Sequence, residues 1–173
     1  RQSLVGSEMC IRDRCEAGQW QDGTGRTACK GSRCTAGKFF EQVGRTTSVV
    51  CKNCVAGQHQ DETAQTGCKG TACVAGTFYA SIAQASAVTC KDCVAGQYQD
   101  QTAQTGCKGL ACVPGKYFGQ DRKIVPVTCK PCSAGQYQDK TGQLNCKGSP
   151  CAAGKYFEQV ARTGSVVCKN CVA

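Results

Sequence analysis

The chain has 173 residues, of which 18 are cysteine, and a formal net charge of +9. This cysteine density indicates a disulfide scaffold, and Leu, Ile, Val and Phe together supply only 26 residues, about 15 %, below the roughly 20 % expected of a globular core. These figures exclude a single Rossmann-type or barrel-type core, and no run of about 18 apolar residues is present to insert directly into a membrane.

The cysteines repeat with a fixed period. Cys15, Cys54, Cys93 and Cys132 follow one another at intervals of 39 residues, and the cysteines between them keep the same register. Self-similarity at a fixed period is the signature of a tandem array. It predicts four repeats, at residues 15–53, 54–92, 93–131 and 132–170.

Both ends lie outside these four repeats. Residues 1–14 are out of register, because Arg12 stands where the period places a cysteine. They resemble the translated sequencing-adaptor peptide of raw transcriptome assemblies, and a natural linker is the alternative. Residues 171–173 match the opening of a further repeat. We therefore expect the chain to be part of a longer array.

The first half of each repeat has the spacing Cys-x13-Cys-x4-Cys. A glycine lies three residues after the opening cysteine and an aromatic residue five after it, with His59 as the exception. We expect a short strand at residues 97–99 to meet a polar turn at 100–104, and Asp22-Gly23 is a strong hairpin signal. The Asp of the recurring Gln-Asp-x-Thr motif is predicted to cap backbone amides of this turn.

The second half has the spacing Cys-x16-Cys-x2-Cys and adds a second aromatic residue. Short β-branched runs precede its second cysteine and predict strands at residues 49–50, 88–89, 127–128 and 166–167. No helical periodicity extends over three turns. The predicted fold class is a small disulfide-rich protein: an elongated tandem array of short two-stranded β-ribbon modules, with little helix and no central hydrophobic core.

Spacing alone does not determine which cysteines pair. The simplest scheme joins the first and second cysteine of every half and leaves Cys10 and Cys171 over; closure within the Cys-x2-Cys pairs is the alternative. In the simplest scheme the structural disulfides are Cys15 with Cys29, Cys34 with Cys51, Cys54 with Cys68, Cys73 with Cys90, Cys93 with Cys107, Cys112 with Cys129, Cys132 with Cys146 and Cys151 with Cys168.

Cysteine usage also predicts the compartment. A cytosolic zinc protein is disfavoured, because the Cys-x2-Cys pairs recur only every 39 residues and the chain has a single histidine. Disulfides at this density persist in oxidising surroundings. We predict an extracellular location, either secreted or in a cell-surface ectodomain.

The repeated Cys-x-x-Gly-x-aromatic opening resembles the cysteine-rich repeats of ephrin-receptor-like extracellular proteins. It is also similar to the first submodule of tumour-necrosis-factor-receptor repeats, in which the opening and second cysteines pair. The nearest match is Cys112-Val-Pro-Gly115-Lys-Tyr117, and the resemblance covers residues 15–173. It implies an extracellular architecture that serves receptors, adhesion molecules, matrix and surface coats alike.

A lysine follows the second cysteine of every half. One interpretation is a ladder of cations that contacts an anionic glycan, and the other is that the lysines solvate and protect strand edges. An extracellular protein or an anionic glycan is thus the expected class of partner; nucleic acid is disfavoured, because the repeat at 54–92 is net acidic. The positions are Lys30, Lys52, Lys69, Lys91, Lys108, Lys130, Lys147 and Lys169.

Neither catalysis nor a cofactor is predicted. Ser, His and carboxylate residues form no recurring catalytic set, and one carboxylate per motif is too few for a calcium shell. The predicted function is that of a non-catalytic structural spacer, coat or stalk. The alternative is a ligand-binding or adhesion module of a receptor ectodomain, with contacts in the most variable stretches, residues 41–48, 80–87 and 119–126.

Overall fold

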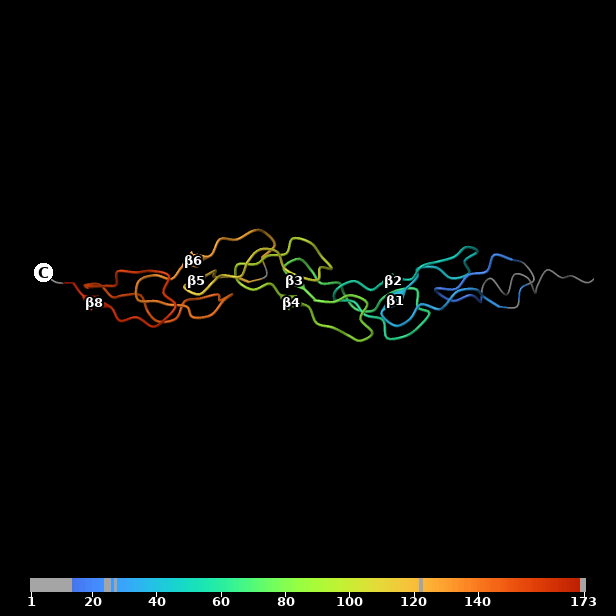
Figure 1. Ribbon diagram of the computed structural model, residues 1–173, viewed down its shortest axis with the longest axis horizontal. Helices are drawn as coiled ribbons and strands as arrows, with labels where there is room; N and C mark the ends of the chain where they lie inside the picture. Colours follow the sequence, from blue (N-terminus) through green and yellow to red (C-terminus); the bar gives the residue numbers. More distant parts are fainter. Residues whose placement is uncertain (1–13, 24–25, 27, 122, 172–173) are drawn as a thin grey trace, which may run out of the picture. The chain divides into compact units, whose positions relative to one another are not determined.

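The computed structural model describes residues 14–23, 26, 28–121 and 123–171 (Figure 1). Within these residues the chain forms no helix, and eight strands of two residues each make four two-stranded antiparallel sheets. The predicted disulfide-rich array of short two-stranded ribbons is therefore confirmed. The strands are β1 (Lys38–Phe39), β2 (Lys52–Asn53), β3 (Thr77–Phe78), β4 (Lys91–Asp92), β5 (Lys116–Tyr117), β6 (Lys130–Pro131), β7 (Lys155–Tyr156) and β8 (Lys169–Asn170).

Each sheet lies in the second half of one repeat. In the first of them, Lys38 of β1 is opposite Asn53 of β2 and Phe39 is opposite Lys52. The other three sheets keep the same register. The second strand of each pair starts directly after the second cysteine, so the disulfide brings the returning chain to the point where pairing begins.

The strands predicted at the valine-rich runs are wrong. Residues 49–50, 88–89, 127–128 and 166–167 have no regular structure, and Val50 and Val167 are each 81 % exposed. A strand requires a partner for its backbone groups, and these residues precede the disulfide that brings the chain back to its partner. The position of the disulfide, and not the local β-propensity of the valines, therefore determines where the strands begin.

The first halves form narrower ribbons. Tyr98 and Lys108 make one antiparallel bridge, in which the Tyr98 amide donates to the Lys108 carbonyl over 3.0 Å and the Lys108 amide donates to the Tyr98 carbonyl over 2.8 Å. His59 forms the same bridge with Lys69, since the bridge uses backbone atoms alone. The strand expected at residues 97–99 is thus reduced to a single bridged residue.

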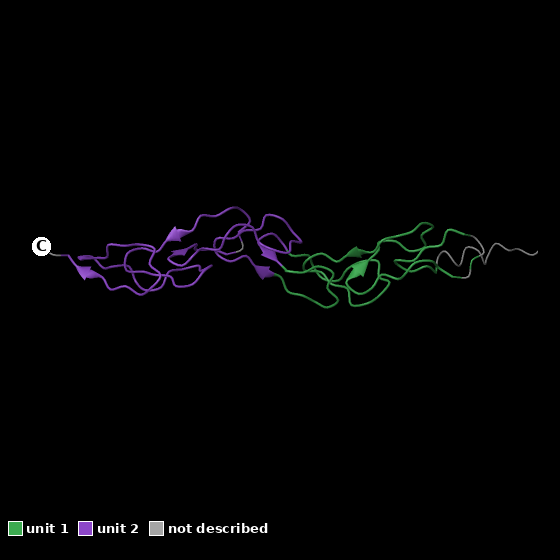
Figure 2. Cartoon of the chain, viewed as in Figure 1, with its two compact units in different colours: residues 1–73, 79–90 green, residues 74–78, 91–173 purple. Residues whose placement is uncertain are grey.

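The chain divides into two compact units (Figure 2). One contains the residues up to Cys73 together with Tyr79–Cys90, and the other contains Val74–Phe78 together with the residues from Lys91 onward. Inside each unit, neighbouring halves are joined through their backbones. The Ala64 amide donates to the Cys34 carbonyl over 2.7 Å in the first unit. A bond of the same kind joins the equivalent residues of the second unit. Each half is thus stabilised by its neighbours, as in other repeat proteins.

Small side chains fill the interior. The apolar residues excluded from solvent are cysteines and alanines, whereas ten of the eleven aromatic side chains are only partly buried and Tyr156 is 37 % exposed. Without a shared core of large apolar side chains, the disulfides and backbone hydrogen bonds carry more of the stabilisation. The buried apolar residues are Cys15, Ala17, Cys34, Cys54, Ala56, Cys73, Cys93, Ala95, Cys112 and Cys132.

Candidate functional site

Disulfides close every half of the four repeats. The structure joins the first and second cysteines, with sequence separations of 14 in first halves and 17 in second halves and Cα–Cα distances of 5.6–5.8 Å. These Cα–Cα distances are ordinary for a disulfide. Among the described residues Cys171 is without a disulfide and is exposed, and Cys10 lies outside the described residues. The pairs are those of the simplest scheme.

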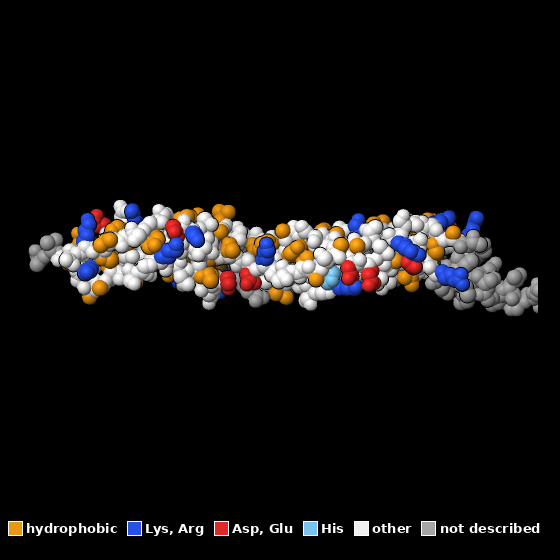
Figure 3. All heavy atoms as spheres, turned by 90° about the horizontal axis from the view of Figure 1, so that it is seen from below, with side chains coloured by type: hydrophobic (Ala, Val, Ile, Leu, Met, Phe, Trp, Pro, Cys, Tyr) orange, Lys and Arg blue, Asp and Glu red, His pale blue; other side chains and the backbone are white. Residues whose placement is uncertain are grey.

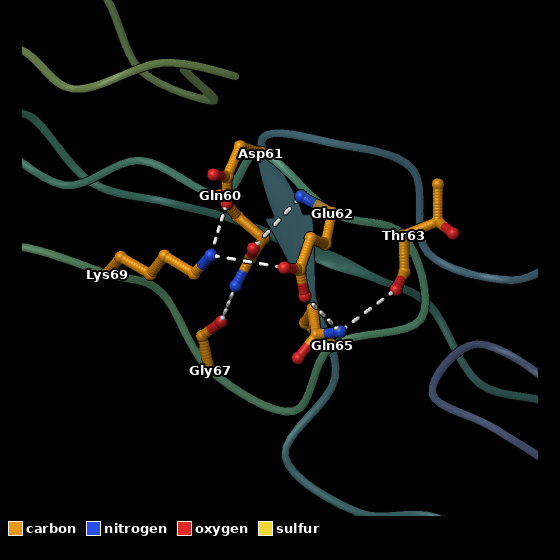
Figure 4. Close-up of polar contacts among 7 residues, drawn as sticks. All are labelled: Gln60, Asp61, Glu62, Thr63, Gln65, Gly67 and Lys69. Carbon is orange, nitrogen blue, oxygen red and sulfur yellow. Dashed lines mark hydrogen bonds and ion pairs between the residues drawn. The ribbon is translucent and has the colours of Figure 1, made fainter.

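A buried glutamine organises the turn of each first half. The side chain of Gln60 is almost fully buried, donates to the Gly67 carbonyl over 2.7 Å and accepts from the Glu62 amide over 3.1 Å (Figure 4). One side chain therefore satisfies a donor and an acceptor on opposite sides of the turn. The same two contacts recur at Gln21, Gln99 and Gln138.

The backbone of the same glutamine joins the neighbouring halves. The Gln99 amide donates to the Lys123 carbonyl over 2.8 Å, and its carbonyl accepts from the Gly76 amide over 2.7 Å. One residue thus connects the preceding half, its own turn and the following half. Sequence reasoning missed this role, although the signal was present: Gln precedes Asp in all four motifs, and an exposed turn requires no such residue.

The aspartate of the motif forms an ion pair that the sequence did not predict. The Asp61 carboxylate forms an ion pair with Lys69 over 2.5 Å, while the amide of the next residue, Glu62, is bound by Gln60 (Figure 4). The Glu62 amide is thus capped by Gln, while a backbone hydrogen bond at the Asp61 carboxylate also lowers the pKa of that group. The equivalent pairs are Asp22 with Lys30, Asp100 with Lys108 and Asp139 with Lys147.

These pairs lower the pKa of all four aspartates and raise the pKa of two of the lysines. The hydrogen bond from Lys69 lowers the pKa of Asp61 below its ordinary 3.8, and the corresponding lysine is the largest cause at the other three aspartates. In turn, the hydrogen bond to Asp61 raises the pKa of Lys69 above 10.5, and Asp139 does the same for Lys147. Both shifts favour the charged pair.

Acid should weaken these turns modestly. A carboxylate whose pKa is lower in the folded state stabilises the fold at pH values above 3.8, and this contribution is lost as the pH falls through the lowered pKa. We expect the melting temperature to be level from about pH 5 to 8 and to fall below about pH 4. The effect is small because the pairs are half exposed.

A variant in which all four motif aspartates are changed to asparagine should show a weaker dependence of the melting temperature on pH between about pH 2 and 4. Calorimetry of the parent and the variant over the same series of pH values measures this difference. Asp121→Asn is the control, since its side chain is exposed and forms no ion pair with any other residue of the described part of the chain. If the fourfold variant loses stability in acid as steeply as the parent, the ion pairs do not contribute. The four positions are Asp22, Asp61, Asp100 and Asp139.

The lysines of the second halves differ among repeats. Lys52 pairs with Glu41 over 2.8 Å and Lys169 with Glu158 over 3.8 Å, whereas Lys91 and Lys130 have no ion pair within the described residues. Six of the eight lysines considered as a cation ladder therefore have a carboxylate partner. On the face in Figure 3, several Lys and Arg side chains lie beside Asp or Glu.

Removing one buried glutamine should loosen its own half. Gln99→Ala leaves the Gly106 carbonyl and the Gln101 amide without their side-chain partner. We expect the free energy of local unfolding of this half to fall by about 2–3 kcal/mol. Hydrogen exchange over residues 93–111 measures it. Gln101→Ala, which truncates an exposed side chain, should change protection by less than about 0.5 kcal/mol. Equal protection in both variants would contradict the role of Gln99.

No protein-family model matches the chain, and a search of curated proteins finds no match either. The residues that the structure describes contain no helix able to cross a membrane. In the same residues, no three His, Cys, Asp or Glu side chains are grouped so as to hold a metal ion. The eight disulfides are typical of proteins that reside in an oxidising, extracellular or secreted environment.

Proposed function

We propose that the chain is a non-catalytic segment of a secreted or cell-surface protein, in which the repeats act as a structural spacer, coat or stalk. The observation that carries this proposal is the repeated glutamine turn. In both units the same residue type ties one half to the halves before and after it. Such uniform contacts allow repeats to be added without new interfaces, which suits a protein part whose task is length.

The distribution of buried groups supports the proposal. Among the described residues, the buried side chains are opening cysteines of the halves, alanines and the turn glutamines, together with Thr77. The Cys-x-x-Gly-x-aromatic openings resemble those of ephrin-receptor-like extracellular repeats, which occur in surface proteins of many kinds. Disulfide closure of every half also limits access of proteases to the backbone, a useful property outside the cell.

Deleting one whole repeat tests the spacer proposal. A variant without residues 93–131 joins Asp92 to Cys132 and keeps the cysteine register. We expect the oxidised variant to resist trypsin as the parent does, and its largest dimension in small-angle X-ray scattering to be shorter. The parent after reduction is the control and should be cleaved rapidly. A variant that scrambles its disulfides, or one whose largest dimension is unchanged, would overturn the proposal.

A further inference from the structure

The lysine after the second cysteine has two environments in the second unit. Lys169 of β8 is paired with Glu158, which follows Phe157. Lys130 of β6 occupies the equivalent position, but Gly119 follows Phe118 there, and no carboxylate within the described residues pairs with Lys130. The substitution of Glu by Gly therefore leaves one exposed cation without its internal partner.

The same substitution coincides with a larger hollow. Lys130 lines an open hollow of about 420 Å³ together with Tyr117, Phe118, Gly119 and Gln120. The equivalent hollow in the next repeat measures about 160 Å³ and is lined by Phe157, Glu158, Gln159 and Lys169. Since glycine has no side chain, the space occupied by the glutamate in one repeat is open in the other.

A second cation contacts two of the residues that line the hollow. The Lys123 Nζ is 5.7 Å from the centroid of the Phe118 ring, and it donates a hydrogen bond to the side-chain oxygen of Gln120. This bond directs the amide oxygen of Gln120 to a lysine and leaves its NH₂ group as a donor. The hollow thus combines two aromatic side chains, one lysine and an amide donor, and a second lysine contacts two of its lining residues.

We propose that this hollow binds an acidic sugar residue, such as the uronic acid of an anionic glycan. The aromatic side chains offer an apolar surface for the C–H face of a pyranose ring. Lys130 would bind its carboxylate, Lys123 would add positive charge beside Phe118 and Gln120, and the Gln120 amide would donate to a hydroxyl group. A small hollow with aromatic walls and a few polar groups is the usual form of a ligand site.

An acidic peptide fits these features less well. Its carboxylate would satisfy Lys130, but it offers no flat C–H face to Tyr117 and Phe118. This site extends beyond the structural role proposed above and does not depend on it. The two ideas also fail separately, because loss of sugar binding leaves the deletion experiment unaffected.

The test is an NMR titration of the oxidised chain with a hyaluronan hexasaccharide, whose only charges are uronate carboxylates. We expect saturable shifts confined to residues 116–120, 123 and 130, and weaker binding at higher salt. Gly119→Glu restores the glutamate of the next repeat, and the Cβ of residue 119 would meet no atom within 4 Å. This variant should lower the affinity about fivefold or more.

Matched variants and ligands complete the test. Lys130→Gln should weaken binding, whereas Lys108→Gln, at a lysine already paired with Asp100, should not. Glu158→Gly should create a second site at Lys169. The proposal is overturned by the absence of shifts at this site, by unchanged affinity in Gly119→Glu, by binding of a sulfated hexasaccharide but not hyaluronan, or by equal binding of a hexaglutamate peptide.

Discussion

Replacing Cys93 and Cys107 together by alanine should open the half at residues 93–111 while most of the chain stays folded. The disulfide closes a loop of about 15 residues, and its removal is expected to cost about 3 kcal/mol, because the unfolded loop regains its conformational freedom. The buried interior of this half offers little else, since Cys93 itself and Ala95 are its buried apolar residues. Amide hydrogen exchange in residues 93–111 should accelerate roughly a hundredfold.

The loss of hydrogen-exchange protection should extend to the two adjacent halves and be absent from more distant ones. Gln99 of the opened half bonds to Gly76 and Lys123, so protection of these residues should fall as well, and residues 34–53 should be unaffected. Cys171→Ser is the control, because Cys171 is exposed and has no disulfide within the described residues. Parent-like exchange across residues 93–111 in the double variant would show that the disulfide does not hold this half closed.

Gly96→Ala should destabilise the protein more than the other single substitutions considered above. The φ of Gly96 is +95°, and the equivalent glycines of the other three first halves have φ values of 90–96°. This left-handed conformation costs a residue with a Cβ roughly 1–2 kcal/mol. An added Cβ would also lie 2.5 Å from the Cys112 amide nitrogen and 2.6 Å from the Leu110 carbonyl oxygen. With the cost of overpacking included, we expect the free energy of unfolding to fall by about 2–5 kcal/mol.

Gly106→Ala provides the matched control for this prediction. It lies in the same half, and its added Cβ would meet no atom within 4 Å. Thermal unfolding and hydrogen exchange of both variants should show parent-like behaviour for Gly106→Ala and a weakened half for Gly96→Ala. Similar behaviour of the two would mean that the close approach at Gly96 does not constrain the turn.

Covalent and periodic features of this molecule could be predicted from sequence. The 39-residue register defined the modules, and the low content of large apolar residues predicted the missing central core. The short loops between cysteines left room for ribbons only a few residues long. These inferences depend on cysteine positions, residue composition and loop lengths. Tertiary contacts change none of these quantities.

Features that depend on neighbouring modules could not be predicted. The valines at 49–50 have β-propensity, but their backbone pairs with no strand among the described residues, and pairing begins at Lys52 instead. Gln99 looks like one polar turn residue among several, and its burial results from the halves on either side of it. Whether Lys130 or Lys169 forms an ion pair depends on the residue eleven positions earlier. The cysteine spacing carries no information about that residue.

The most direct test of the central claim, that each half closes on itself, is disulfide mapping by mass spectrometry without reduction. The free thiols of the protein are blocked, and the protein is unfolded in acid before digestion. Trypsin should then release residues 53–69, 70–91 and 92–108 as separate peptides. Each should be two hydrogen atoms lighter than its dithiol form, because each contains both cysteines of one disulfide. Peptides 70–91 and 92–108 released as one linked species, as a Cys90–Cys93 bond requires, would contradict the account.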